Sequence, residues 1–327
     1  MRMKQGLFAD AARFLLLGAL IVVIVVFGLV NPAFLSATNI MDILRTSSII
    51  LLMACGSILI WSTGEINFAV GAQLTLGGAV LGKLMSVLDP SFYPLGIVIA
   101  LIAVGLTGLI AGVFVINLGV PSFIATLAIS LSIDATNIVL TQNTTLFSSN
   151  WGSVYTILGQ GYVFGIIPLP AVICLALAVG THLFMNRTRT GNYIYAIGGN
   201  QTASRQVGVN VSKIKYIAFV LGSVLIGFAG ILQTSINNNV LLTSGTDLLM
   251  PSICATVLGA TFLTLGKYNV VGSAVAAVLI ITLQNGVISC GGAFYMKDIV
   301  QGLVLLVAVG VIALVRKGAL PSVKFES

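Results

Sequence analysis

Long apolar runs that follow one another along the chain limit its fold more than any other feature of the sequence. Ten such runs, separated by polar residues, glycine or proline, occupy most of the 327 residues. A helix needs about 20 apolar residues to cross a bilayer, where every backbone polar group must be bonded within the protein. The pattern therefore predicts an all-α integral membrane protein with about ten transmembrane helices. The predicted spans are 14–30, 48–63, 68–87, 94–117, 122–140, 166–184, 216–233, 248–263, 270–288 and 299–315.

Composition favours a single membrane domain over residues 1–327. Hydrophobic residues make up 58% of the chain and charged residues 7%, and the mean hydropathy is +1.11. A soluble domain carries about 25% charged residues. The first span follows a short basic stretch, as in a signal peptide. No convincing small-residue cleavage site follows that span, so we expect a retained helix.

The distribution of basic residues predicts the orientation of the spans. If the N-terminus is cytosolic and the chain crosses ten times, 12 of the 15 lysines and arginines lie on the cytosolic side. The exceptions are Arg45, Lys83 and Lys297. Because basic residues accumulate in cytosolic loops, both termini are predicted to be cytosolic. The net charge of +7 is then an orientation signal, and we expect contact with lipid and none with nucleic acid.

One long connection is predicted on the extracytoplasmic side, over about residues 141–165. It carries the aromatic residues Trp151, Tyr155 and Tyr162. Tryptophan and tyrosine are enriched at both interfaces of a membrane. We therefore interpret these rings as interfacial anchors, with docking of a partner as the alternative.

A second long connection, over about residues 186–215, is predicted to be cytosolic and is rich in both charge and polarity. Within it, Asn200 is a good N-cap and Gly208 a plausible C′ residue for a short helix. Such a helix under the membrane is a suitable surface for a soluble motor to push. The alternative is a solvated basic loop.

Residue patterns typical of catalysis or metal binding are missing from the sequence. The four cysteines form no Cys-x-x-Cys pair, there is one histidine, and no Gly-x-Ser-x-Gly sequence occurs. The glycine-rich stretch 77–83 has Leu84 where a phosphate-binding loop needs serine or threonine. Ionisable residues are sparse in the spans: Asp134, with Glu65 and Asp247 near span ends. We therefore predict no catalytic residue, metal site or cofactor in this chain, and a solute-conducting protein energised from outside.

A short internal similarity links two distant spans. Residues 120–126 (Val-Pro-Ser-Phe-Ile-Ala-Thr) resemble residues 250–256 (Met-Pro-Ser-Ile-Cys-Ala-Thr), and the two spans run in opposite directions in this map. Inverted repeats are common in transporters. Chance similarity in an apolar alphabet is the alternative explanation.

Four segments resemble the sugar-type permease subunits of ABC importers, the ribose-permease family. They occur in the family's order and extend from about residue 31 to residue 272. The segments are Asn31-Pro32-x-Phe34-Leu35, then Val120 to Leu127, then Arg187 to Asn200 followed by Ala203, Arg205 and Gly208, and finally Gly259-x-Thr261-x-Leu263-x-x-Gly266-Lys267 with Val271-Gly272.

The resemblance implies a type II ABC importer permease fold in the cytoplasmic membrane of a bacterium. Two permease subunits, identical or different, would stand side by side, and an extracytoplasmic binding protein would deliver the solute. Two cytosolic ATPases, which carry the ATP and Mg²⁺, would grip the cytosolic loops. The chain itself would be a non-catalytic transport subunit. The residues implied in contact with the ATPase are Gly199, Asn200, Ala203, Arg205 and Gly208.

Several acidic residues usual in the family are absent here. The family signature Gly-Gly-Ile-Asp-Leu-Ser-Val-Gly appears as Gly-Glu-Ile-Asn-Phe-Ala-Val-Gly over residues 64–71, so that Asn67 and Ala69 replace an acid and a hydroxyl. A Glu-Leu-Asp stretch is replaced by residues 249–251 (Leu-Met-Pro), and Gln201 stands where glutamate is usual. The missing acids fit either an unusual substrate or one half of a heterodimeric permease.

We expect the cargo to be a monosaccharide or a related small polar solute, because a neutral cargo suits the sparse charge. The alternatives are an ABC permease for a nucleoside or an amino acid, and a stand-alone carrier coupled to protons or sodium. Side chains in the predicted spans are candidates for contact with the solute, although polar residues also join helices to one another in lipid. The candidates are Asn67, Phe68, Gln73, Asn117, Thr126, Asp134, Asn137 and Asn285.

Overall fold

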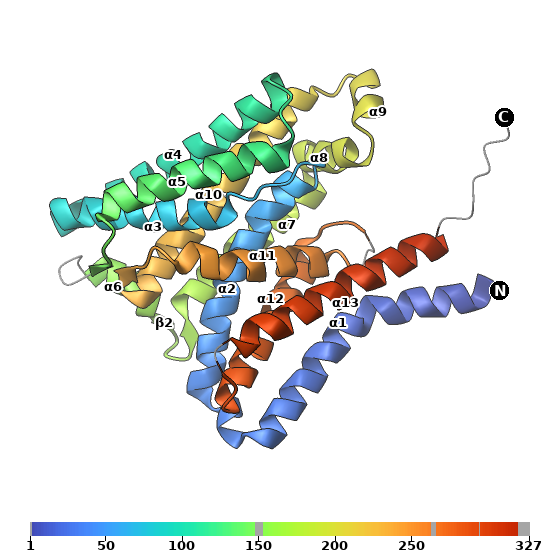
Figure 1. Ribbon diagram of the computed structural model, residues 1–327, viewed down its shortest axis with the longest axis horizontal. Helices are drawn as coiled ribbons and strands as arrows, with labels where there is room; N and C mark the ends of the chain where they lie inside the picture. Colours follow the sequence, from blue (N-terminus) through green and yellow to red (C-terminus); the bar gives the residue numbers. More distant parts are fainter. Residues whose placement is uncertain (1, 148–152, 263–265, 294, 320–327) are drawn as a thin grey trace.

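The computed structural model describes residues 2–147, 153–262, 266–293 and 295–319, which form a helical bundle (Figure 1). Within these residues, ten helices have sixteen residues or more, and each of them overlaps one predicted span, although α1 and α2 begin 12 and 11 residues before the predicted starts. These helices are α1 (Arg2–Val30), α2 (Ala37–Trp61), α3 (Val70–Val87), α4 (Tyr93–Gly112), α5 (Ser122–Thr141), α7 (Leu169–Arg187), α10 (Val211–Asn237), α11 (Ser244–Gly259), α12 (Val270–Ser289) and α13 (Met296–Ala319).

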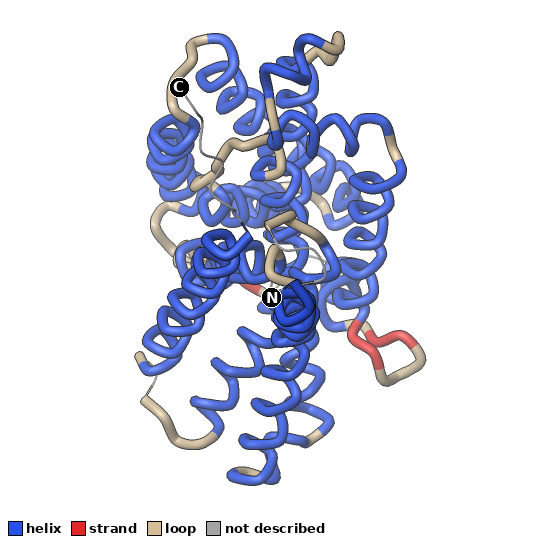
Figure 2. Tube along the Cα trace, turned by 90° about the vertical axis from the view of Figure 1, so that its right-hand side faces the viewer, coloured by secondary structure: helices blue, strands red, loops and turns tan. Residues whose placement is uncertain are grey.

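Shorter elements connect the long helices. The helical ones are η1 (Pro32–Leu35), η2 (Pro90–Phe92), the π-helical η3 (Val113–Asn117), α6 (Ser153–Gln160), α8 (Arg189–Gly199) and α9 (Gln201–Gln206). Two antiparallel strand pairs, red in Figure 2, complete the connections. They join β1 (Leu146–Phe147) to β4 (Asn239–Val240), and β2 (Tyr162–Val163) to β3 (Ile167–Pro168).

Seven of the long helices are long and apolar enough to cross a membrane: α2, α3, α4 with η3, α5, α7, α10 and α12. In α1 the apolar part is the shorter stretch Leu16–Val30, and α11 has only 16 residues with Pro251 inside it. The structure therefore confirms an all-α membrane protein. Ten complete crossings stay a prediction.

Helices α2 and α10 approach each other closely at two glycines. A Cβ at Gly56 would lie 2.5 Å from the carbonyl oxygen of Gly222, and a Cβ at Gly222 would lie 2.6 Å from the carbonyl oxygen of Gly56. Neither position therefore has room for a side chain, and the two backbones are in direct contact. Close approach through small residues is a common way to pack helices in lipid, where apolar side chains gain little by leaving the solvent.

The long helices α2–α5 and α10–α13 form two groups of four along the chain. The first helix of each group packs against helices of the other group. Helix α2 packs mainly against α10, α12, α7 and α11, and α10 packs mainly against α4, α2 and α3. The sequence similarity between residues 120–126 and residues 250–256 does not correspond to this arrangement. Pro121 immediately precedes α5, whereas Pro251 lies inside α11, so the two similar segments occupy different places in their groups.

Segments predicted to share a side of the membrane lie together at one end of the bundle. Arg45 donates a hydrogen bond from Nη2 to the hydroxyl of Tyr162 at 2.6 Å, and its guanidinium lies 5.0 Å from the centre of that ring. At the opposite end, the Lys267 ammonium lies 3.8 Å from the ring centre of Tyr195. Figure 1 shows the two ends, with α8 and α9 at one and α6 and β2 at the other.

The three aromatic residues predicted as interfacial anchors behave differently from one another. Tyr155 is fully buried, and its ring lies edge-on to Tyr93 with 5.7 Å between ring centres. The prediction that Tyr155 anchors the membrane interface is therefore wrong, because α6 packs inward against α10 and α7. Tyr162 is exposed, and Trp151 lies outside the described residues.

Candidate functional site

The short helix predicted in the cytosolic loop is present as α9. The side-chain oxygen of Asn200 accepts a hydrogen bond from the backbone N–H of Ala203 at 2.9 Å and caps the first turn. The helix ends before Gly208, whose φ of +83° lies in the left-handed region that glycine adopts without strain. The residues that begin and end this helix are thus the two that the sequence predicted, and both act locally.

Helix α8 fixes α9 to the end of the bundle. Ile194 and Ile197 are buried in the core, and the hydroxyl of Tyr195 donates to the carbonyl oxygen of Tyr268 at 2.8 Å. A Cβ at Gly198 would collide with the carbonyl oxygen of Ser62, which shows how closely α8 approaches the turn between α2 and α3. The five residues predicted to contact an ATPase begin with the last residue of α8 and continue through α9 to Gly208. All five are exposed: Gly199, Asn200, Ala203, Arg205 and Gly208.

An ion pair that the sequence did not reveal lies beside α9. The ammonium of Lys215, in the second turn of α10, forms an ion pair with Glu65 at 2.5 Å and donates a hydrogen bond to Oε1 of Gln201 at 2.9 Å. The Lys215 side chain is only 8% exposed. Two positions that depart from the family pattern, Glu65 and Gln201, therefore meet at one ammonium.

Four of the eight predicted pathway residues are buried and bonded within the protein. The Asn67 amide donates to Oε1 of Gln73 at 3.0 Å, and the Gln73 amide donates to the hydroxyls of Thr107 and Ser223 at 3.0 and 2.9 Å. Because Gln73 lies on α3, Thr107 on α4 and Ser223 on α10, this chain of amides and hydroxyls joins three helices. One member of this chain, Thr107, also lines the groove between α3, α4 and α5.

Thr126 and Asn137 join α5 to the same region of α3. The Thr126 hydroxyl accepts a hydrogen bond from the backbone N–H of Phe68 at 3.1 Å, and the Asn137 amide donates to the carbonyl oxygen of Ala72 at 3.3 Å. The ring of Phe68 is half-buried and packs edge-on against Phe123, with 5.1 Å between ring centres. These residues therefore shape the start of α3.

The remaining three predicted residues are dispersed. Asp134 is half-buried on α5, and Asn117 is exposed at the end of η3. Asn285 lies on α12, where its side-chain oxygen accepts a hydrogen bond from Ser289, and the next residue, Gly286, packs against Phe27 of α1. The eight residues therefore do not form one cluster.

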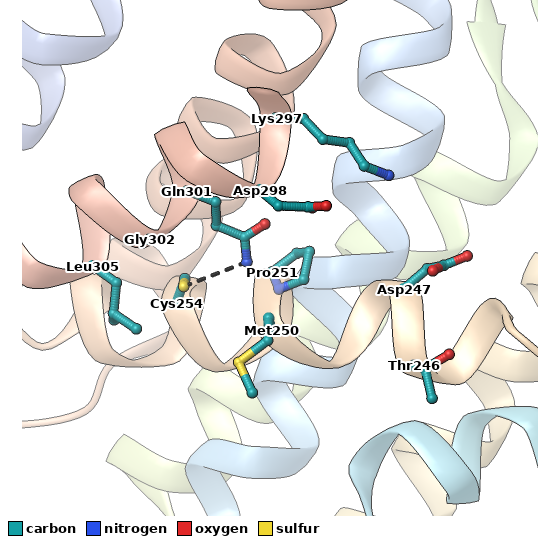
Figure 3. Close-up of a pocket in the computed structure, with 10 residues that line it drawn as sticks. All are labelled: Thr246, Asp247, Met250, Pro251, Cys254, Lys297, Asp298, Gln301, Gly302 and Leu305. Atoms are coloured by element: carbon teal, nitrogen blue, oxygen red, sulfur yellow. Dashed lines mark hydrogen bonds between the residues drawn. The ribbon is translucent and has the colours of Figure 1, made fainter. Parts of the chain in front are cut away.

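A polar cavity lies instead between α11 and α13 (Figure 3). Its volume is about 340 Å³. Figure 3 shows the lining side chains, which come from α11 and from the first turns of α13. The polar ones are Thr246, Asp247, Lys297, Asp298 and Gln301, and the less polar ones are Met250, Pro251, Cys254, Gly302 and Leu305.

Gln301 is the most buried polar residue of this cavity. Its side-chain oxygen accepts a hydrogen bond from the amide of Gln284 on α12 at 2.6 Å, and its own amide points to the sulfur of Cys254 at 3.6 Å. Only Asp247 stood out in the sequence, as an ionisable residue near a span end. The cavity itself depends on side chains from two helices that are more than 40 residues apart in the sequence, such as Cys254 and Lys297, so no local pattern predicted it.

A wide apolar groove of about 830 Å³ runs between α3, α4 and α5. Large aliphatic side chains line most of it, with Thr107, Ser132 and Thr136 among them. The outer faces of α4 and α5 also expose many aliphatic residues. These surfaces fit lipid or another apolar protein surface rather than water.

Comparison with known proteins gives a consistent result over most of the chain. A family model described as the permease component of branched-chain amino acid transport systems matches residues 39–309. The ribose import permease proteins of Haemophilus influenzae and Escherichia coli are 35% and 34% identical to the chain, over 89% of its length and 90% of theirs. The xylose transport system permease protein of H. influenzae is 28% identical, over 90% and 94%. No solved structure matches the chain.

Proposed function

Because the chain belongs to the family of ABC-importer permease components, we propose that it forms half of a membrane pathway that imports a monosaccharide or a related small polar solute. The observation that carries this proposal is α9, a capped helix seated on the bundle with its outward residues exposed. A transport subunit that hydrolyses no ATP needs such a surface, because the free energy for uptake has to enter through contact with another protein. The names of the relatives support a sugar as cargo.

The proposed assembly contains two permease subunits, identical or different, in a bacterial cytoplasmic membrane. Each has the type II fold, crosses the membrane ten times and keeps both termini in the cytosol. A cytosolic ATPase with its own ATP and Mg²⁺ binds α8 and α9 of each subunit. A solute-binding protein delivers the cargo at the opposite end, where Arg45 and Tyr162 lie.

In this proposal the polar cavity between α11 and α13 receives the solute as it enters. Sugar hydroxyls both donate and accept hydrogen bonds. The carboxylates of Asp247 and Asp298 can accept from them, and the Lys297 ammonium and the Gln301 amide can donate to them. A neutral polyol would be held by several hydrogen bonds without the burial of a net ligand charge.

The residues around the start of α3 have a second role in the proposed pathway. Asn67, Gln73, Thr126 and Asn137 hold α3 against α4, α5 and α10, and contact the solute only when these helices separate. Phe68, Asn117, Asp134 and Asn285 remain proposed contacts with the moving solute.

Reconstitution tests this function directly. The permease is incorporated into vesicles together with its ATPase, ATP is enclosed on the ATPase side, and uptake of radiolabelled ribose, xylose and fructose is measured with the binding protein outside. We expect uptake of at least one of these sugars that requires both ATP and the binding protein. Uptake that persists without the ATPase and follows an imposed proton or sodium gradient would establish a stand-alone carrier instead.

The family description also leaves an amino-acid cargo to be tested. Leucine and adenosine are offered as competitors in the same assay, each in hundredfold excess over the labelled sugar. We expect an unlabelled sugar to compete and both other solutes to leave uptake unchanged. Efficient competition by leucine or adenosine alone would assign the pathway to that class of solute.

A further inference from the structure

Lys215 is placed where three segments of the chain meet. It lies in α10, its ion-pair partner Glu65 lies in the turn between α2 and α3, and its second partner Gln201 is the first residue of α9. An ammonium group has three hydrogens to donate and is costly to bury without partners. Since the side chain is 8% exposed, the two contacts hold α9 and the α2–α3 turn on one charged group.

The α2–α3 turn carries this connection into the bundle. The backbone N–H of Ile66 donates to the hydroxyl of Ser122 at 3.0 Å, in the first turn of α5. The next contacts are those of Phe68 with Thr126 and of Asn67 with Gln73. Side-chain contacts thus lead from α9 through Lys215 to Glu65. The backbone of residues 65–68 then connects Glu65 to the hydrogen bonds that join the start of α3 to α5 and α10.

Space beside the ion pair allows these segments to shift. A cavity of about 350 Å³ is bounded by Glu65, Gln201 and Lys215 on one side and by the connection between η3 and α5, including Val120 and Ser122, on the other. A densely packed contact would resist relative movement. Here α9 and the start of α5 are separated by a polar space that can narrow or widen.

From this geometry we propose that Lys215 is a positioning residue that transmits displacement of α9 to the start of α3 and α5. This proposal rests on the proposed function, because it assumes that an ATPase moves α9. An element whose arrangement is biased by both sites can couple two separated sites. The ion pair supplies that element, and it connects the surface that the ATPase would grip to the region that the solute would cross.

The sequence itself suggests a sharp test. In the family pattern the acidic residue stands at position 201 and glycine stands at position 65, whereas this chain has Gln201 and Glu65. Because the side chains at positions 65 and 201 both reach Lys215 in this chain, a carboxylate at either position would lie beside its ammonium. The double variant Glu65→Gln/Gln201→Glu therefore moves the carboxylate from the α2–α3 turn to α9. It keeps one acid–ammonium pair, which now joins α9 to α10.

The measurement is the amount of ATP hydrolysed for each solute molecule taken up by the reconstituted transporter. Coupling free energies in allosteric proteins correspond to effects of roughly 5- to 150-fold, so we expect Glu65→Gln to lower uptake about tenfold and to raise the ATP-to-solute ratio several-fold. The double variant is expected to return both values to within about threefold of wild type. Lys215→Met should resemble Glu65→Gln, whereas Lys213→Met, which removes an exposed ammonium two residues away, should resemble wild type.

Two results would overturn the proposal. One is a normal ATP-to-solute ratio in Glu65→Gln, and the other is a failure of Gln201→Glu to rescue it. If Glu65→Gln does not accumulate in membranes, Glu65→Asp keeps the charge but shortens its reach, and a normal ratio in that variant counts equally against the proposal. Wild-type protein that shows no ATP-dependent uptake would instead refute the proposed function, so the two failures can be told apart.

Discussion

Gly56 and Gly222 set the distance between helices α2 and α10. Each glycine faces the carbonyl oxygen of the other, so neither tolerates a side chain without movement of a backbone. The apolar character of this region was evident from the sequence, but the pairing of these two glycines was not. They lie 166 residues apart, and glycine is frequent throughout the chain.

Substitution of Gly56 by alanine is expected to destabilise the folded protein. The added methyl group would lie 2.5 Å from the carbonyl oxygen of Gly222, and overpacking of this kind costs about 1–3 kcal/mol. The thermal unfolding midpoint of the detergent-solubilised protein should fall accordingly. Gly180→Ala on α7 is the matched control, because no atom lies within 4 Å of its added methyl group. Equal midpoints for the two variants would contradict the contact between α2 and α10.

At the polar cavity, Asp298→Asn is expected to slow uptake of the solute. A hydrogen bond to a charged group contributes about 1.5–3 kcal/mol, so the loss of one such acceptor should reduce the uptake rate about tenfold or more. Asp89→Asn, on an exposed connection at the predicted extracytoplasmic side, is the control and should transport normally. Unchanged uptake by Asp298→Asn would remove this cavity from the pathway.

The helices themselves could be predicted because their signals are local. Apolar runs of suitable length gave one helix each, and the Asn200 cap and Gly208 gave α9 its two ends. The contacts between helices could not be predicted in this way. Lys215 and Glu65 are 150 residues apart, and nothing beside either residue indicates its partner. The same reason explains why the eight predicted pathway residues were dispersed rather than gathered in one cavity.

Ala203→Asp within α9 and Gly208→Pro just after it are both expected to abolish transport without preventing membrane insertion. Proline holds φ near −65° and cannot adopt the +83° found at position 208, and an aspartate at 203 places a charge on the exposed face of the helix. Uptake and the amount of protein in membranes are measured together. Ser86→Ala, exposed near the far end of α3, is the control. Normal ATP-dependent uptake by both α9 variants would refute the coupling role of this helix.

Over the whole molecule, four native cysteines provide a test of orientation. Cys290 is exposed after α12, at the end predicted to be extracytoplasmic, whereas Cys55, Cys174 and Cys254 are buried. A membrane-impermeant maleimide added to intact cells should therefore label the protein at Cys290 alone. In a Cys290→Ser background, Val207→Cys places an exposed thiol on the C-cap of α9, which should react only after the membrane is opened. Labelling of Val207→Cys in intact cells would reverse the predicted orientation.

The exchange of α2 and α10 between the two helix groups has a mechanical consequence. Since α2 is enclosed by α10, α12, α7 and α11, the groups α2–α5 and α10–α13 cannot swing apart as separate blocks without the withdrawal of a buried helix from its neighbours. The two helix groups of a single subunit are thus held together by α2 and α10, each of which packs against helices of the other group. In the proposed pair of subunits, the large opening and closing movements then occur between one subunit and its neighbour. Within a subunit, smaller shifts of the helices, such as those at the start of α3 and α5, accompany them.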